Sequence, residues 1–238
     1  MQNNKIDKLI SYCQQSQQEL KAMLDKELQE QGRQTINKDG FLYSMGTHPV
    51  LLVSHLDTVH NKLPTDIYVD RSDPDSPDGD LRCRNDVGVG GDDRAGIFIV
   101  MEMIKHFDCH VLFCEDEEQH GIGAGKFTES NIYPDVQFIV EFDRRGRDDA
   151  VFYGCNNTEF TVFVTSFGFQ EQVGSFSDIS LVAPHLGIAA VNLSSGYYEA
   201  HSEREFVRLG DVDSIIERAV PLISDVSTRY EYPKSHNA

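Results

Sequence analysis

Apolar residues recur every three or four positions near the start of the chain, at Ile6, Leu9, Cys13, Leu20 and Leu24, and Gly32 ends the run. This period predicts one amphipathic helix over residues 6–28. Similar patterns predict helices over residues 96–107, 124–130 and 178–186. A last helix is predicted to start near Asp211 and to be ended or kinked by Pro221, because proline cannot donate a helical hydrogen bond.

Short apolar runs predict strands over residues 41–45, 50–55, 111–114, 136–142 and 189–193, and alternation predicts another over residues 158–167. Consecutive apolar positions indicate strands that are covered on both faces. A hairpin is expected between residues 67–69 and 81–83. Helices that alternate with buried strands predict an α/β fold, a three-layer α/β/α sandwich around a mixed, mostly parallel sheet. No repeat or linker interrupts the chain, so we expect a single domain over residues 1–238.

Composition narrows the class of protein. The chain has 238 residues, 39% of them apolar and 25% charged, which suits one soluble domain with a sizeable core. No apolar run reaches the roughly 18 residues of a membrane span, and the polar amino terminus lacks a secretory pattern. Five cysteines without paired spacing indicate reduced thiols, so we expect a cytoplasmic protein. A net charge of -18 would repel phosphate backbones and argues against nucleic-acid binding.

Metal-binding residue types stand at five places along the chain. They are His55-Leu56-Asp57, Asp92-Asp93-Arg94-Ala95-Gly96, Glu117-Glu118, Asp143 and His201. Three of these places directly follow or end predicted strands. Because sites in such sheets lie at the carboxyl ends of the strands, we expect these side chains to gather there.

Each of these signals is weak by itself, since a His-x-Asp pair is usually a surface pair and adjacent acids are usually solvated. Asp92 or Asp93 could equally cap a helix. Together, however, they offer the carboxylate and imidazole ligands that two metals sharing one carboxylate need. Asp57 could orient His55 by accepting its second ring N–H. One of two adjacent acids can bind metal while its neighbour takes a proton from water.

The order of these motifs resembles that of the di-zinc exopeptidase clan, which includes bacterial leucyl aminopeptidases, tripeptidase T, carboxypeptidase G and aminoacylases. The resemblance covers residues 50–207 and implies a phosphorylase/hydrolase-like fold. It also implies the roles of the site residues, and the metals are expected to be two zinc ions, with cobalt or manganese as alternatives. His55 and Asp143 would bind one ion, Glu118 and His201 the other, and Asp92 both, while Asp57 would orient His55 and Glu117 would be the general base.

The chain also departs from these relatives. Many of them insert a lid or dimerisation domain between the third acid and the final histidine, or between His-x-Asp and the bridging Asp. Here residues 144–200 and 58–91 leave no room for one, so we expect a lidless catalytic core. Some relatives hold the oxyanion with a tyrosine directly before the final histidine, where this chain has Ala200. Tyr197 or Tyr198 could take that role.

Two further residues are candidates for substrate contact. Asp178, in Gly174-Ser175-Phe176-Ser177-Asp178, resembles the serine-aspartate loop that lines the pocket in this clan, although a helix cap is the alternative. Arg144 could pair with a substrate carboxylate. The acidic run between Asp70 and Asp80 suggests calcium, but its irregular spacing favours a solvated loop.

The resemblance implies metal-dependent hydrolysis of amide bonds, and we expect an aminopeptidase that acts on short peptides. A deacetylase or deacylase of N-acyl amino acids is the main alternative, since the same metals would serve it. A metal-binding relative without catalysis is a further alternative, and a single-zinc glutaminyl cyclase a weaker one. The preferred side chain, the native metal and the oligomeric state are left open.

Overall fold

A computed structural model describes residues 1–233, so the last five residues of the predicted domain lie outside it. Its helices are α1 (Asn3–Cys13), α2 (Gln17–Glu30), α3 (Gly91–Met103), α4 (Ile122–Thr128), α5 (Thr158–Thr165), α6 (Ile179–Leu186), α7 (Leu209–Ser224) and the 3-10 turn η1 (Glu117–Gln119). Its strands are β1 (Thr35–Lys38), β2 (Phe41–Ser44), β3 (His48–His55), β4 (Ile67–Asp70), β5 (Asp80–Cys83), β6 (Cys109–Cys114), β7 (Phe138–Arg144), β8 (Asp149–Val151), β9 (Gln170–Gln172), β10 (Ala190–Ser194), β11 (Tyr197–Tyr198) and β12 (Phe206–Arg208).

The main sheet is mixed, and its centre is parallel. Within residues 1–233 it has eight strands in the order β1-β2-β6-β3-β7-β10-β8-β9. Strands β6, β3, β7 and β10 run parallel to their neighbours in this central block. Their carboxyl ends therefore meet at one edge of the sheet, as the predicted site requires.

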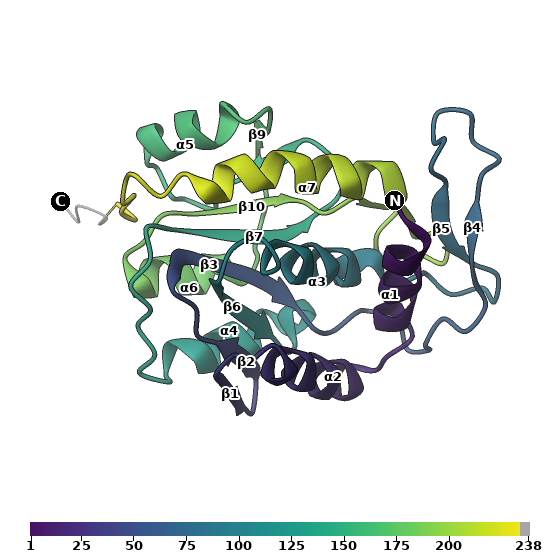
Figure 1. The fold of residues 1–238 in the computed structure, drawn as a ribbon, viewed down its shortest axis with the longest axis horizontal. Coiled ribbons are helices and arrows are strands. Elements are labelled where there is room, and N and C mark those ends of the chain that lie inside the picture. Colours follow the sequence, from purple (N-terminus) through teal and green to yellow (C-terminus); the bar gives the residue numbers. More distant parts are fainter. Residues whose placement is uncertain (234–238) are drawn as a thin grey trace.

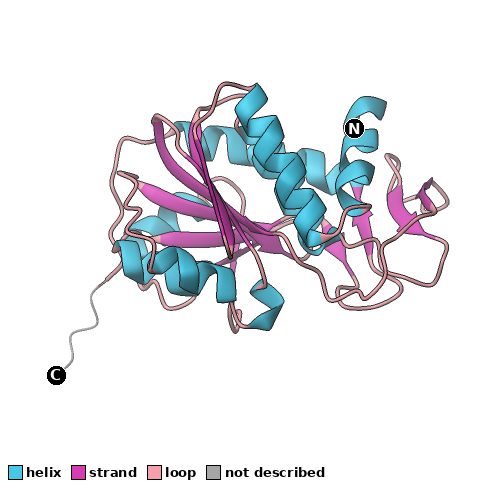
Figure 2. Ribbon diagram, turned by 90° about the horizontal axis from the view of Figure 1, so that it is seen from below, coloured by secondary structure: helices cyan, strands magenta, loops and turns pink. Residues whose placement is uncertain are grey.

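Helices cover both faces of this sheet (Figure 2). On β3, Val50 and Leu52 face the core formed with α1, α2, α3, α5 and α7, while Leu51 and Val53 face the core formed with α4 and α6. All four side chains are fully buried, which explains why this strand is apolar at consecutive positions. The predicted three-layer α/β/α sandwich is confirmed.

The predicted amino-terminal helix is two helices. The first ends at Cys13, and Ser16 caps α2, where its hydroxyl accepts from the Glu19 amide and the Glu19 carboxylate accepts from the Ser16 amide. This capping box is visible in the sequence as Ser-x-x-Glu. The unbroken apolar stripe concealed it, because α1 and α2 both pack on the same core.

The predicted strand over residues 158–167 is wrong, because Thr158–Thr165 forms helix α5. Asn157 caps the helix by accepting from the Phe160 amide (3.0 Å). One face of the helix is buried through Phe160 and Val164. β-branched and aromatic residues favour strands, but packing overrides that weak preference here. Of the two effects expected of Pro221, the helix end is wrong, since α7 continues beyond it to Ser224.

A second, smaller sheet lies at one end of the molecule. The predicted hairpin is confirmed as β4 and β5, and it projects from the body (Figure 1). It is joined by β11 and β12, which were not predicted, in the order β11-β12-β5-β4 within the described residues. Arg208 pairs with Asp73 (2.8 Å) and Asp80 (3.1 Å), so arginine neutralises part of the acidic run for which calcium was considered. Among the described helices, none combines the length and apolar character that a membrane crossing requires.

Candidate metal centre

Four residues of the site lie at or just after the ends of three parallel strands. His55 is the last residue of β3, Glu117 and Glu118 form the turn η1 after β6, and Asp143 lies near the end of β7. Asp92 comes from the start of α3, where the Asp92–Asp93 peptide bond is cis. This helix packs directly against β7. Gly96 makes the close approach possible, since a Cβ at this position would lie 1.8 Å from the Phe142 carbonyl oxygen.

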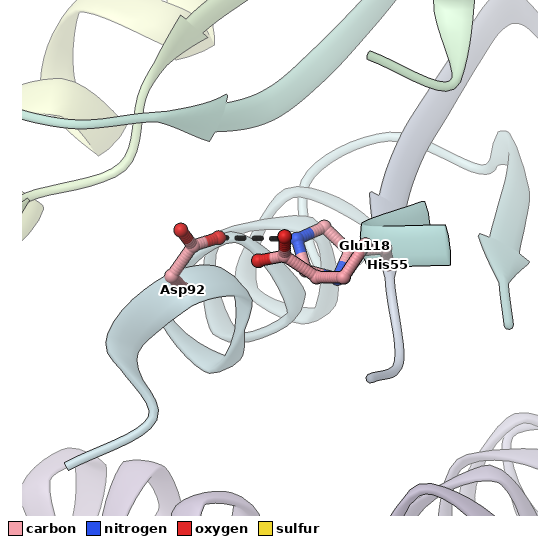
Figure 3. A group of neighbouring side chains, drawn as sticks. All are labelled: His55, Asp92 and Glu118. Carbon is pink, nitrogen blue, oxygen red and sulfur yellow. Dashed lines mark hydrogen bonds and ion pairs between the residues drawn. The ribbon is translucent and has the colours of Figure 1, made fainter. Parts of the chain in front are cut away.

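The five predicted metal ligands lie together. His55 Nε2 lies 3.1 Å from Asp92 Oδ1 and 3.3 Å from Asp143 Oδ1. His201 Nε2 lies 3.2 Å from Asp92 Oδ2 and 2.8 Å from Glu118 Oε1. The two oxygens of Asp92 therefore face two separate histidine and carboxylate pairs. Figure 3 shows the His55 ring beside Asp92, with Glu118 next to them.

The donor set fits divalent cations. Ligand atoms of His55, Asp92 and Glu118 lie within 4.8 Å of one another, and so do those of His55, Asp93 and Asp143. Imidazole nitrogen and carboxylate oxygen are the ligands that zinc and similar ions take in proteins. Asp93 is otherwise engaged, since its carboxylate accepts from the Ser54 hydroxyl and from the Gly96 amide (3.0 Å). Asp92, in contrast, has its two oxygens beside the two histidines.

The carboxylates of the cluster are crowded and desolvated. Burial raises the pKa of Glu117 to about 9, and repulsion by Asp143 adds to the shift. Burial also raises the pKa of Asp143 to about 6, against the attraction of His55. Burial would raise the pKa of Asp92 as well, but hydrogen bonds from the two histidines outweigh it and hold that pKa below its usual range. Such a concentration of negative charge favours bound cations.

Neighbouring carboxylates raise the pKa of both histidines. A hydrogen bond to Asp92 is the largest cause that raises the pKa of His201 to about 9. Burial works against charge on His55, but Asp143 and other neighbouring carboxylates outweigh it and raise its pKa well above the usual value. Metal binding would therefore compete with protons on these rings, because a histidine ligand must be neutral.

Asp57 links two of the strand ends. Its Oδ1 accepts from His55 Nδ1 (3.1 Å) and from the Glu117 amide (2.9 Å), and its Oδ2 accepts from the Glu118 amide (3.1 Å). The side chain thus fixes the ring of His55 and the backbone of η1 together. Arg94, fully buried, donates to the carbonyls of Leu56 (2.7 Å) and Asp57 (2.8 Å) and supports the segment that follows β3.

A pocket opens over the cluster, with a volume of about 280 Å³. It is lined by Asp92, Glu117, Glu118, His120, Asp143, Arg144, Tyr153, Ser175, Phe176, Tyr197 and His201. Sequence reasoning did not assign Tyr153 or His120 to the site, and no spacing pointed to them. Ser175 and Phe176 belong to the serine-aspartate segment, which did carry a signal.

The candidate substrate residues fall in different places. Arg144 lines the pocket and donates to Asp149 at 3.3 Å. Tyr197 also lines it, and its hydroxyl donates to the Asp143 carbonyl at 3.3 Å. Tyr198 is directed elsewhere, since its hydroxyl donates to Asp211 at 2.5 Å and it is absent from the lining.

Asp178 lies at the cap position of α6, but its side chain makes no cap hydrogen bond. Its carboxylate is fully buried, and neither oxygen has a hydrogen-bond partner among residues 1–233. Burial raises its pKa to about 7. The residue therefore lies beneath the pocket rather than in its lining.

Comparison with known proteins identifies relatives by structure alone. No family model and no curated protein matches the sequence. Aminopeptidase PepT from Bacillus cereus is 14% identical and superposes with a TM-score of 0.74, covering 94% of this chain and 98% of that one. An aminopeptidase from the archaeon Desulfurococcus kamchatkensis is 14% identical, with a TM-score of 0.65 and coverage of 93% and 95%.

A glutaminyl cyclase from Porphyromonas gingivalis is 11% identical, with a TM-score of 0.62 and coverage of 93% and 96%. The chain has the fold of these enzymes. Its structural neighbours include peptidases of the clan that the sequence motifs resemble. At such identities the likeness concerns the fold, so the chemistry has to be argued from the site.

Proposed function

We propose that this protein is a metal-dependent aminopeptidase that acts on short peptides. The observation that carries the proposal is the position of Asp92, whose two oxygens lie 3.1 and 3.2 Å from the Nε2 atoms of two different histidines. Each histidine has a second carboxylate beside it, Asp143 or Glu118. This arrangement suits two ions that share one ligand.

In this proposal His55 and Asp143 hold one ion, Glu118 and His201 hold the other, and Asp92 holds both. Zinc fits the donor set best, with cobalt and manganese as alternatives. When bound, two such ions would polarise a carbonyl and make a water molecule more acidic.

Glu117 is the proposed general base. Its carboxylate lines the pocket, belongs to neither ligand group among the described residues, and is held through its backbone by Asp57. It takes a proton from water as the water oxygen forms a bond to the scissile carbonyl carbon. It then gives that proton to the amine as the carbon–nitrogen bond breaks.

The charges of the pocket favour a substrate with a free amino terminus. The lining contains four carboxylates, Asp92, Glu117, Glu118 and Asp143, which attract an ammonium group. We propose that Tyr197 and Arg144 also contact the substrate, since both line the same pocket. Arg144 would pair with a carboxylate of the peptide.

We further propose that the chain works as a lidless catalytic core. Residues 58–91 form little more than the β4–β5 hairpin, and residues 144–200 are used by β8, α5, β9, α6, β10 and β11. Neither segment contains a separate body that could close over the metals. Selectivity would then depend on one pocket and on the free amine.

Glutaminyl cyclisation is the second candidate, because the Porphyromonas gingivalis enzyme has the same fold. The second histidine and carboxylate pair, His201 with Glu118, favours the two-metal peptidase. Deacylation of N-acyl amino acids would use the same residues and differs only in the substrate that the pocket accepts.

One experiment separates these functions. Matched peptides with free and N-acetylated amino termini, together with peptides that begin with glutamine, should be assayed with saturating zinc, cobalt or manganese. We expect kcat/KM for the free-amine member of each pair to be higher by at least about tenfold, equivalent to 1.4 kcal/mol. Preference for the acetylated member would promote the deacylase, and pyroglutamate formation without cleavage would promote the cyclase.

A further inference from the structure

Glu205 is a buried acid that no sequence motif assigned to the site. It precedes β12, and only 2% of the residue is exposed. Its Oε1 accepts from the Asp92 amide at 3.0 Å. Its Oε2 accepts from the Gly90 amide (2.8 Å) and from His60 Nε2 (2.8 Å). Two of these three contacts, with the amides of Gly90 and Asp92, lie in the segment that leads into Asp92.

At Gly88 the backbone lies too close to His60 and Glu205 to carry a side chain. A Cβ at Gly88 would meet His60 Nε2 at 2.2 Å and Glu205 Oε2 at 2.7 Å. Gly90 has a φ of +72°, which a residue with a side chain rarely adopts. The glycines therefore let the backbone reach the Glu205 carboxylate, and two amides point at it.

Glu205 and His201 belong to the same short segment. The Glu205 amide donates to the Ser202 carbonyl at 3.1 Å, which closes a turn between them. His201 contacts the side chain of Asp92 (3.2 Å), and Glu205 accepts a hydrogen bond from the backbone amide of Asp92. One segment thus fixes Asp92 at two points, and hydrogen bonds from amides to a buried carboxylate are strong.

We propose that Glu205, supported by His60, is a positioning residue that orients Asp92 so that its two oxygens face the two histidines. The inference rests on the proposed function, because it concerns the shared ligand of the same centre. If Asp92 moves, both ions lose a ligand together. Loss of Asp143, in contrast, removes a ligand from one ion only.

The test compares Glu205→Gln with Glu203→Gln, which makes the same charge change on an exposed residue of the same segment. A glutamine at position 205 would turn an N–H donor toward an amide that is itself a donor. Binding constants for both Co²⁺ ions are measured by competition with a chromophoric chelator, and their coordination is followed by absorption spectra. We expect both constants of Glu205→Gln to weaken by about 10–100-fold, with altered spectra, and those of Glu203→Gln to stay unchanged.

Asp143→Asn provides the contrast, since it should weaken one Co²⁺ constant only. His60→Asn serves where Glu205→Gln does not fold: it removes one donor to Glu205, and we expect both constants to weaken about fivefold, as for one ordinary hydrogen bond. The positioning role would be overturned, with the two-metal centre intact, if Glu205→Gln bound Co²⁺ with wild-type affinity. It would also be overturned if only one of the two Co²⁺ binding constants weakened. Wild-type protein that binds no Co²⁺ or Zn²⁺ would overturn the proposed function itself.

Discussion

The two parts of the proposed metal centre are held in different ways. The strand-end half consists of His55, Glu117, Glu118 and Asp143, which follow buried parallel strands and inherit their positions from the sheet. The loop half consists of Asp92, in the irregular first turn of α3, and His201, in the loop between β11 and β12. Buried polar groups, above all Glu205, hold this second half through side-chain hydrogen bonds.

This difference teaches where rigidity comes from in the site. A strand end is fixed by ladder hydrogen bonds and by packing on both faces, so its side chains need few additional partners. An irregular segment has neither, and its backbone amides must find acceptors when they are buried. The loop half therefore depends on a few individual side chains, which makes it easier to disturb by single substitutions.

The largest effect is expected inside the strand-end half, between adjacent acids. Glu117→Gln should retain both metals and the fold but lose about 10²–10⁴-fold in kcat, because the proposed base is removed and the ligands are not. Glu118→Gln should instead weaken one metal. Metal content by elemental analysis and steady-state kinetics on one free-amine peptide measure both. Equal loss of metal in the two variants would contradict the division of roles.

The next effect tests whether the strand-end half also needs a side-chain support. Asp57→Asn should weaken metal binding by about 10–100-fold, because an amide cannot accept from all of His55, Glu117 and Glu118. Calorimetric titration with Zn²⁺ measures the change. Asp7→Asn, an exposed residue of α1, is the matched control and should bind Zn²⁺ like the wild type. Unchanged affinity in Asp57→Asn would mean that the strand ends alone fix His55.

The proposed ligands could be predicted from the sequence because their order along the chain resembles that of a known clan, and three of them end or follow predicted strands. Glu205 could not, because its partners are backbone amides more than a hundred positions away, and backbone groups leave no trace in residue identity. Helix α5 was missed for a related reason. Its residues favour a strand, but they form a helix because Phe160 and Val164 pack into a core whose other members are distant in the sequence. Contacts between residues that are distant in the sequence decided both cases.

The next prediction uses two adjacent tyrosines that the sequence could not separate. Neighbouring residues of a strand point to opposite faces, so one of the pair faces the pocket and the other does not. Tyr197→Phe should lower kcat by about tenfold, or 1.4 kcal/mol, through loss of a hydroxyl at the pocket wall. Tyr198→Phe should leave kcat within about twofold, since its hydroxyl donates to Asp211 instead. Kinetics under saturating metal measure both variants, and a reversed order would move the substrate contact to Tyr198.

The smallest effect is a dependence of metal-free stability on pH, which reports on both halves at once. Folding raises the pKa of Glu117, in the strand-end half, from 4.5 to about 9, and that of His201, in the loop half, from 6.5 to about 9. In each case the folded protein binds the proton more tightly than the unfolded chain. The resulting stability is fully present below the unfolded pKa and is lost as the pH rises through the folded one. Metal-free protein should therefore melt at lower temperature as the pH rises from about 5 to 9, by several degrees, since about 1 kcal/mol shifts Tm by 2–4 °C at this size.

Bound metal competes with these protons, so saturating Zn²⁺ should restore Tm most at the alkaline end. Scanning fluorimetry with chelator or Zn²⁺ across this range measures the two curves. Glu117→Gln removes one of the two groups and should flatten the metal-free curve, and a metal-free Tm that instead rises with pH would contradict the crowding of charge in both halves.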